Sequence, residues 1–320
     1  MCCKYIRNYV GDTTTRKTTN GKRGYKDLSY FKPKECHYCK STENIRWRFR
    51  YNHITKKRRY LCNKCKKAFV VDDGFWKRKK QREFIAQCLD LYVNGMSLRK
   101  VKTHIEQFSD ITVSHTAISR WLKIYSVLVK SFTDGLKIET SGIYHTDEIY
   151  IKCSGDQNYF FDLIDAKSRF LVATFYDKEK GLHGAKGLFD ITKKRAEKLL
   201  FVYTDGLPAY MNIIPKMWYT KRDKQCKEVQ HIRIIDQHDY RNNIIERVQG
   251  TLRERIKVMR GFKNPKSTEA TLELLVIWYN FIRIHQGIQM TPAEMCGIKL
   301  NLGQNKWLGL IYRSKECLAF

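Results

Sequence analysis

The spacing of hydrophobic residues along the chain changes near position 140. Residues 77–132 carry apolar side chains at steps of three and four, which predicts three short helices with tight connections. From residue 140 on, the stretches GIYHTDEIYIKC, NYFFDLIDAK and RFLVATFYD, with turns at Ser154-Gly155 and Ala166-Lys167, predict three consecutive antiparallel strands. The pattern therefore predicts a helical segment followed by a segment that begins with strands.

Short strands and longer helices alternate in the rest of the chain. HGAKGLFDITKKRAEK predicts a helix, and LLFVYTDG and HIRIID predict short strands. NNIIERVQGTLRERIKVM and STEATLELLVIWYNFIRIH predict two long helices. The order βββαβαβαα predicts an α/β core over residues 138–298, with a mixed sheet flanked by helices, and a C-terminal tail over 299–320.

The three helices over residues 77–135 predict a helix-turn-helix unit, whose third helix begins after Ser114. The outward-facing side chains of this helix are expected to contact DNA, and they are His115, Thr116, Ser119, Arg120 and Lys123. A plain helical linker domain is the alternative. The neighbouring basic, cysteine-rich segment favours DNA binding.

Two CxxC pairs on either side of a basic insert predict a zinc ribbon over residues 31–72. The pairs are Cys36 with Cys39 and Cys62 with Cys65. Each pair can place two thiolates on one tight turn, at about 2.3 Å from a zinc ion. The zinc either only holds a small module together or also supports DNA binding. Aromatic residues alternate with basic ones in the insert, and its expected DNA contacts are Arg46, Arg48 and Arg50.

Positive charge dominates the chain and is concentrated at its start. The net charge is +29, and residues 1–80 hold 24 Lys and Arg against 6 Asp and Glu. Residues 1–30 are polar and aperiodic, which predicts a basic disordered arm or a solvated tail. This charge predicts a polyanionic partner. The start of the chain lacks an export signal and no apolar run is long enough to span a bilayer, which predicts a cytoplasmic protein with no membrane partner.

An acid interrupts the apolar pattern of the first strand. Alternation places Asp147 on the side of Ile149 and Ile151, whereas Glu148 is expected on a mixed, half-wet face. A lone carboxylate on an apolar face is costly unless a cation or hydrogen-bond donors meet it. Asp147 is therefore expected either at the rim of the core with a partner or at a site that holds something charged.

Two further acids occur where they can converge with Asp147. Asp205 ends a strand, although an Asp-Gly pair alone is also an ordinary turn. Glu246 lies beside the apolar stripe of its helix, on a flank with Arg253 and Lys257, which are expected to contact DNA. Taken singly, Glu246 fits a solvated helical acid. Three converging carboxylates repel one another and need divalent cations, and hard oxygen ligands select Mg²⁺ or Mn²⁺.

The later stretches resemble the DDE transposases of prokaryotic insertion sequences, which have a retroviral-integrase-like, ribonuclease H-like core. The matching pieces are HTDEIYIK, YTDGLPAY, NNIIERVQGTLRERIKVMRGFKN and WYNFIRIHQGIQMTPAEMCGI, over about residues 140–298. The resemblance implies that Asp147, Asp205 and Glu246 are the catalytic, metal-binding acids. It also implies that Arg253 stands at a basic position that touches DNA ends in related enzymes.

One departure from the family pattern concerns the third acid. Forty residues separate Asp205 from Glu246, more than is common, and the stretch KMWYTKRDKQCKEVQ is interpreted as an insertion. Asp236 and Asp239 are therefore rival third acids, but neither lies within a helix followed by basic turns.

The resemblance implies a transposase that binds terminal inverted repeats and catalyses DNA cleavage and strand transfer. It implies two Mg²⁺ or Mn²⁺ ions per site, which bind the attacking and leaving oxygens of a phosphodiester, beside a structural zinc. Expected partners are double-stranded DNA, as terminal repeats and target, and further copies of the chain in a homodimer or larger synaptic assembly. The expected location is the nucleoid in a prokaryotic cytoplasm. The alternatives are a DNA-binding regulator that no longer cuts and a structure-selective nuclease with the same core.

Overall fold

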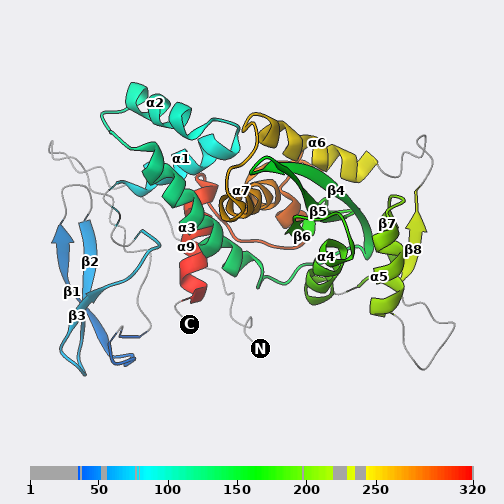
Figure 1. Ribbon diagram of the computed structural model, residues 1–320. Coiled ribbons are helices and arrows are strands. Elements are labelled where there is room, and N and C mark those ends of the chain that lie inside the picture. Colours follow the sequence, from blue (N-terminus) through cyan, green and yellow to red (C-terminus); the bar gives the residue numbers. More distant parts are fainter. Residues whose placement is uncertain are drawn as a thin grey trace. The chain divides into compact units, whose positions relative to one another are not determined.

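The computed structural model divides the chain into two compact units, Met1–Val71 and Asp72–Phe320 (Figure 1). The described residues are 35–36, 38–51, 56–75, 78, 80–196, 198–218, 229–234 and 243–318. The expected arm over 1–30 lies outside them, as do the rival acids Asp236 and Asp239. None of the helices in these described stretches is long and apolar enough to cross a bilayer.

The first unit is a small antiparallel sheet whose core contains few side chains. Its strands are β1 (Asn44–Tyr51), β2 (Lys56–Cys62) and β3 (Ala68–Val70), in that spatial order. Tyr60 and Phe69 are buried beside the cysteines. A module with so little buried apolar surface needs a further source of stability, such as a bound metal.

Each cysteine pair of the first unit lies in a turn, and the two turns match. The residue after each pair, Lys40 or Lys66, has a positive φ, of 59° or 56°. Its backbone N–H donates to the carbonyl oxygen of Cys36 or Cys62 at 2.9 Å. The two CxxC segments therefore adopt the same local conformation, as expected of paired metal-binding turns.

Three helices begin the second unit: α1 (Arg82–Val93), α2 (Leu98–Phe108) and α3 (His115–Thr133). Ser97 caps α2 by accepting from the N–H of Lys100, and Ser114 caps α3 by accepting from the N–H of Ala117. These caps satisfy helix-end N–H groups and set the starts of both helices, and the start of α3 after Ser114 is the predicted one. The three helices pack against one another.

A five-stranded mixed sheet forms the centre of the second unit. Its strands are β4 (Ile143–Cys153), β5 (Asp156–Asp165), β6 (Leu171–Asp177), β7 (Phe201–Thr204) and β8 (Gln230–Arg233). The spatial order is β6-β5-β4-β7-β8, where β4, β5 and β6 are antiparallel neighbours and β7 and β8 pair in parallel. The predicted mixed sheet flanked by helices is confirmed, and a meander followed by two parallel strands is the ribonuclease H-like arrangement.

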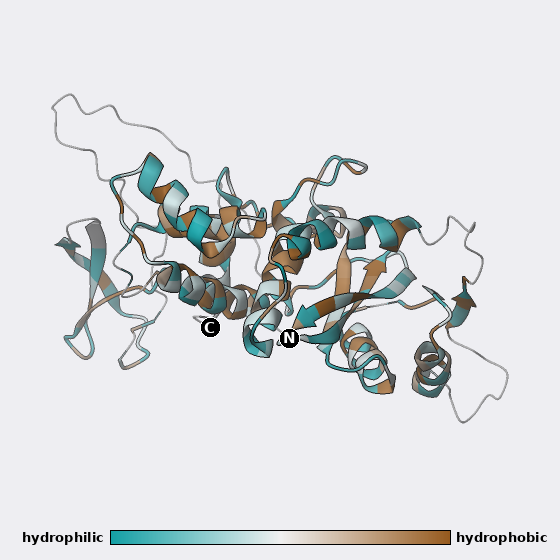
Figure 2. Cartoon of the chain, turned by 45° about the horizontal axis from the view of Figure 1, so that its top comes forward, coloured by the Kyte–Doolittle hydropathy of each residue, from teal (hydrophilic) through white to brown (hydrophobic). Residues whose placement is uncertain are grey.

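Helices cover both faces of this sheet. The helices that follow the first three strands of the sheet are α4 (Leu182–Arg195), α5 (Pro208–Trp218), α6 (Asn243–Lys257), α7 (Pro265–Ile277), a π-helical turn (Trp278–Ile282), α8 (Pro292–Met295) and α9 (Lys306–Leu318). α4 packs on β5 and β6 through Phe161 and Phe175, and α6 packs on β4. Figure 2 shows hydrophobic residues concentrated on the central strands and on the inner sides of the helices.

The helical segment and the sheet share one hydrophobic core, which includes residues from α1 to α3, β4 to β7 and α9. α3 packs against α7 and α9. Residues 299–320, expected as a tail, therefore contain a helix that belongs to this core. The division between a unit over 77–135 and a core over 138–298 stays a prediction about function, since both segments lie in one compact unit.

Two glycines in helices should respond oppositely to alanine. A Cβ at Gly184 would lie 2.1 Å from Phe161, whereas one at Gly250 has no heavy atom within 4 Å. We expect Gly184→Ala to lower the free energy of unfolding by ~2 kcal/mol or more through overpacking. Gly250→Ala, the matched control, should raise it by about 0.5–1 kcal/mol. Denaturant unfolding measures both, and equal effects would contradict the packing described for α4.

Candidate active site and metal centres

The candidate active site lies where β7 ends beside β4. The parallel pairing of these strands stops at Thr204, which lies opposite Thr146. Asp147 and Glu148 follow on β4 just beyond this pair, and Asp205 directly follows the last residue of β7. The carboxyl ends of parallel strands are the usual ligand-binding edge of an α/β sheet.

Three carboxylates gather at this edge. Oxygen atoms of Asp147, Glu148 and Asp205 all lie within 4.8 Å of one another. Asp147 Oδ1 accepts from the backbone N–H of Glu148 at 2.8 Å, and Asp205 Oδ1 accepts from the N–H of Leu207 at 3.0 Å. One oxygen of each aspartate is thus held by the backbone. This donor set fits a hard divalent cation.

Glu148 is buried, with 4% of its surface exposed, so the expected half-wet face is wrong. Glu148 lies opposite Phe161 in the β4–β5 register, on the face that α4 and α5 cover. Its carboxylate pairs with the ammonium of Lys180, and Tyr210 on α5 donates to it at 3.3 Å. The sequence reasoning treated one face of the strand as wet, whereas helices cover both.

Burial and mutual repulsion perturb the acids. Burial raises the pKa of Asp147 to about 7, and the neighbouring carboxylates of Glu148 and Asp205 add to the shift. Burial also raises the pKa of Glu148, which the hydrogen bond from Lys180 partly offsets. A bound cation would relieve this repulsion, so the residues present fit a divalent metal ion.

Asp162 is a further buried acid beside this cluster. It lies directly opposite Asp147 in the β4–β5 register and is 0% exposed. Its Oδ1 accepts from the side-chain amide of Gln249, while Oδ2 has no hydrogen-bond partner among the described residues. Asp165 caps the turn after β5, because its Oδ2 accepts from Ser168. Asp162, in contrast, lies within the strand and not at this turn.

Glu246 lies in the first turn of α6 and is exposed. It is not part of the cluster of three carboxylates found among the described residues. Gln249, three residues and about 4.5 Å further along the helix, reaches Asp162. Glu246 therefore lies one helical turn from a residue that contacts Asp162 but does not join the acid cluster, and the role of Glu246 stays a prediction.

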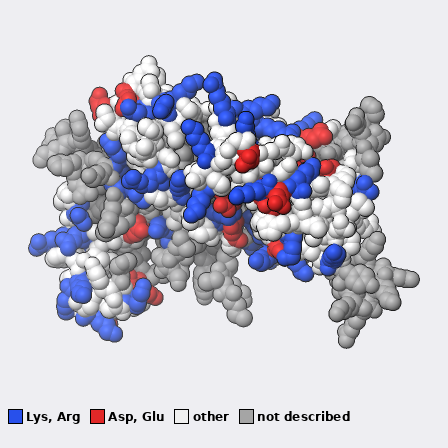
Figure 3. Space-filling model, in the orientation of Figure 1, with Lys and Arg blue, Asp and Glu red and all other residues white. Residues whose placement is uncertain are grey.

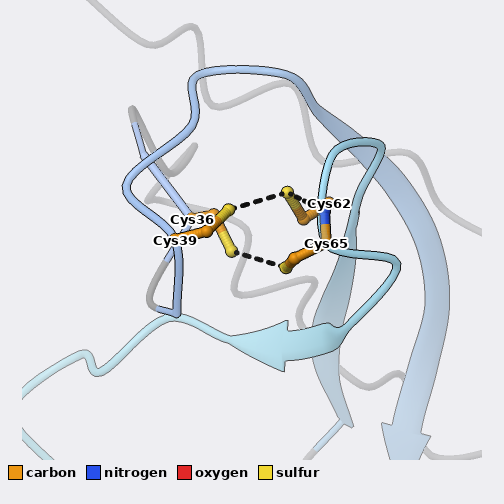
Figure 4. A group of neighbouring side chains, drawn as sticks. All are labelled: Cys36, Cys39, Cys62 and Cys65. Carbon is orange, nitrogen blue, oxygen red and sulfur yellow. Dashed lines mark hydrogen bonds between the residues drawn. The ribbon is translucent and has the colours of Figure 1, made fainter.

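The four cysteines of the predicted zinc ribbon converge (Figure 4). Cys36 Sγ lies 3.6 Å from Cys65 Sγ, and Cys39 Sγ lies 3.5 Å from Cys62 Sγ. Four thiolates about 2.3 Å from one zinc ion would have similar separations. Hydrogen bonding from the backbone N–H of Cys65 contributes most to lowering the pKa of Cys62 to about 6. The cluster fits a zinc ribbon.

The residues predicted to contact DNA lie at the surface of their units. Those on α3 comprise exposed His115, Thr116, Arg120 and Lys123 and the half-buried Ser119. On the first unit, Arg46, Arg48 and Arg50 are exposed, and Arg48 lies over the Trp47 ring at 5.1 Å. On α6, Lys257 is exposed and Arg253 is half-buried. Figure 3 shows Lys and Arg gathered over α2 and α6 on one face of the second unit.

Several residues of this site were missed by sequence reasoning. Glu148 was assigned to the wrong environment, and Lys180, Asp162 and Gln249 were given no role at the site. For Glu148 and Asp162 a signal existed: both lie within strands of a sheet expected to have helices on its flanks. Lys180 and Gln249 reach the acids only through tertiary packing, which residue spacing does not encode.

Two protein-family models match parts of the chain. A model described as a DDE domain matches residues 141–283, and one described as "Transposase, Mutator family" matches residues 75–159. The first covers β4 to α7 and contains Asp147, Glu148, Asp162 and Asp205. The second begins near the start of α1 and extends into β5.

Individual relatives are distant. An uncharacterized 48.3 kDa protein of insertion element ISM1 from Methanobrevibacter smithii is 26% identical over 167 residues, which are 49% of this chain and 39% of that protein. The alignment thus spans well under half of that relative. The HTLV-2 integrase catalytic core domain in complex with magnesium is 13% identical, with 50% of this chain and 99% of that chain covered and a TM-score of 0.38. A simian T-cell lymphotropic virus intasome is likewise 13% identical, with 49% of this chain and 55% of that chain covered and a TM-score of 0.38.

Proposed function

We propose, from the premise that this chain carries the DDE domain of insertion-sequence transposases, that it cuts and joins DNA at the ends of a mobile element. The observation that carries the proposal is the convergence of Asp147 and Asp205 at one edge of the sheet. These are the first two acids of the family pattern. Their separation in sequence is large, and the pairing of β4 with β7 brings them together.

The proposed reaction has two in-line displacements at phosphorus. Water first attacks a phosphodiester at the element end, a new P–O bond forms, and the bond to the 3′-oxygen breaks to leave a 3′-OH. That 3′-OH then attacks a target phosphodiester, joins it, and releases a target 3′-OH. One site can serve both steps because the geometry at phosphorus is the same.

Asp147 and Asp205 would hold divalent ions, with Glu246 as the proposed third acid. Such ions, two per site, supply Lewis-acid polarisation of the phosphodiester and stabilise developing negative charge. The chain itself supplies the fixed carboxylates, since backbone N–H groups orient Asp147 and Asp205. Lys180 on Glu148 limits the net negative charge where a DNA phosphate would approach.

The basic surfaces are proposed to hold the DNA. The exposed basic residues of α3 and of the β1–β2 hairpin would bind the terminal inverted repeats, and Arg253 with Lys257 would lie near the cleaved end. Phosphate contacts of this kind make affinity fall steeply with salt. Joining two ends requires more than one copy of the active site, so a homodimer or larger assembly is proposed.

The proposal is tested by a joining assay on labelled terminal-repeat DNA with Mg²⁺. The parent protein should yield both a nicked end and a product joined to target DNA. A nick without any joined product would favour a nuclease. DNA binding without a nick would favour a regulator that no longer cuts.

The same assay identifies the third acid. Glu246→Gln should reduce cleavage ~100-fold or more, because it removes a carboxylate that would hold a divalent ion at the reacting phosphate. Glu254→Gln, an exposed acid on the same helix, is the matched control and should keep parental activity. Parental cleavage by Glu246→Gln, together with loss in Glu148→Gln, would move the third role to Glu148.

A further inference from the structure

Two hydrogen bonds connect strand β5, through helix α6, to a guanidinium group. The side-chain amide nitrogen of Gln249 donates to Asp162 Oδ1 at 3.1 Å. The amide oxygen of the same residue accepts from Nη2 of Arg253 at 2.8 Å. Asp162 lies opposite Asp147 in the sheet, so the connection begins beside the acid cluster and ends at Arg253.

The inner part of this connection is fully buried. Asp162 and Gln249 are both 0% exposed. Burying a polar atom costs free energy, and a hydrogen-bond partner offsets that cost. An apolar side chain at either position would avoid the cost altogether. Packing between α6 and the sheet alone therefore does not account for polar residues at these two positions.

Asp162 determines which way the amide of Gln249 points. An amide has a donor end and an acceptor end, and the Asp162 oxygen takes the donor end. The acceptor end is then left facing Arg253, one helical turn further on. Reversing the amide would oppose two oxygen atoms at Asp162 and two donors at Arg253.

Arg253 is held close enough to the acids to affect them. Its positive charge lowers the pKa values of Asp147 and Asp162, against the larger upward effect of burial. A free arginine on a helix flank has many side-chain conformations, and fixing one in advance reduces the entropy lost on binding. Lys257, one turn later, is exposed and points from the same flank.

We propose that Asp162 and Gln249 are positioning residues that aim the guanidinium of Arg253 at the DNA phosphate next to the Asp147–Asp205 site. This inference rests on the proposed function. Arg253 contacts the DNA, and the other two act only through it. The hydrogen bond between Asp162 and Gln249 also fixes the rotation of α6 about its axis. The same contact therefore sets where Glu246 lies relative to the acids.

The test is a double-mutant cycle on DNA affinity. Parent, Arg253→Ala, Gln249→Met and the double variant are titrated into fluorescent terminal-repeat duplex at one salt concentration, with Ca²⁺ in place of Mg²⁺. Each single variant should weaken binding about tenfold, the loss expected for one hydrogen bond to a charged group. The double variant should be no weaker than Arg253→Ala alone, because Gln249 acts through Arg253.

A matched control separates positioning from stability. Asn280 is another buried amide that ties a helix to the sheet, through the N–H and carbonyl oxygen of Leu171 on edge strand β6. Asn280→Leu should lower the melting temperature and leave DNA affinity unchanged. Should Gln249→Met fail to fold, Asp162→Ser, too short to reach Gln249, replaces it in the cycle with the same expected result.

Losses that add in the double variant would overturn the inference, as would parental affinity in Gln249→Met or in Arg253→Ala. The readout does not require cleavage. A protein that binds DNA with the predicted cycle and never cuts would contradict the proposed function and support the positioning role.

Discussion

Replacing Asp147 with asparagine should abolish DNA cleavage and at the same time make the metal-free protein more stable. The variant keeps the shape of the side chain and removes one carboxylate from the cluster with Glu148 and Asp205. Loss of a carboxylate that would hold a divalent ion at the reacting phosphate is expected to cost ~100- to 1,000-fold in rate, or more. Cleavage of labelled terminal-repeat DNA with Mg²⁺ measures this.

The gain in stability follows from the raised pKa of Asp147, which burial shifts from 3.8 to about 7. The folded protein holds this proton more tightly than the unfolded chain, so the free energy of unfolding falls as pH rises from about 4 to about 7. Asp147→Asn removes that loss. Its melting temperature should exceed that of the parent above pH 7, by about 2–4 °C for each kcal/mol recovered, and the difference should vanish near pH 4.

Asp156→Asn is the control for both effects, because Asp156 is an exposed acid at the start of β5. It should leave cleavage and the pH dependence of the melting temperature unchanged. An inactive Asp147→Asn protein that is also less stable than the parent at pH 8 would contradict the description of Asp147 as a repelled, buried carboxylate.

Removing two cysteines from the first unit should unfold it. Cys36→Ser together with Cys62→Ser leaves one thiolate in each turn, and structural zinc contributes about 10–16 kcal/mol in small zinc modules. The three strands bury too few side chains to replace that contribution. Zinc content should fall from one ion per chain to near zero, and proteolysis before Asp72 should become rapid.

DNA affinity should fall with the first unit, because Arg46, Arg48 and Arg50 lie on its β1 strand. A loss of about tenfold or more is expected from that number of phosphate contacts. Cys153→Ala, a cysteine on β4 outside the cluster, is the control and should keep its zinc. Unchanged zinc content in the double variant would remove the zinc-ribbon assignment.

Local periodicity was sufficient to predict the order of strands and helices in the second unit. The meander of β4, β5 and β6 consists of apolar-rich segments separated by clear turns, and α6 has a continuous apolar stripe. The cysteine pairs were also predictable, because two CxxC turns have few structural uses other than metal binding. These features depend on residues close together in sequence.

Features set by tertiary packing were not predicted. Glu148 was expected at a half-wet surface, but α5 covers that face and Tyr210 reaches the carboxylate. Aspartate is common in turns, and only the hydrogen bond from Gln249 on α6 makes Asp162 part of the site. The packing of α9 onto α1 and α3 is likewise absent from any local pattern.

The most direct test of the central claim is Mn²⁺ binding by the parent, Asp147→Asn and Asp205→Asn, measured by isothermal titration with zinc already in place. The claim is that Asp147 and Asp205 form one divalent-metal site. The account predicts that the parent binds Mn²⁺ and that each substitution weakens binding at least ~10-fold, as expected when a charged ligand is lost. Equal Mn²⁺ affinity in all three proteins would contradict it.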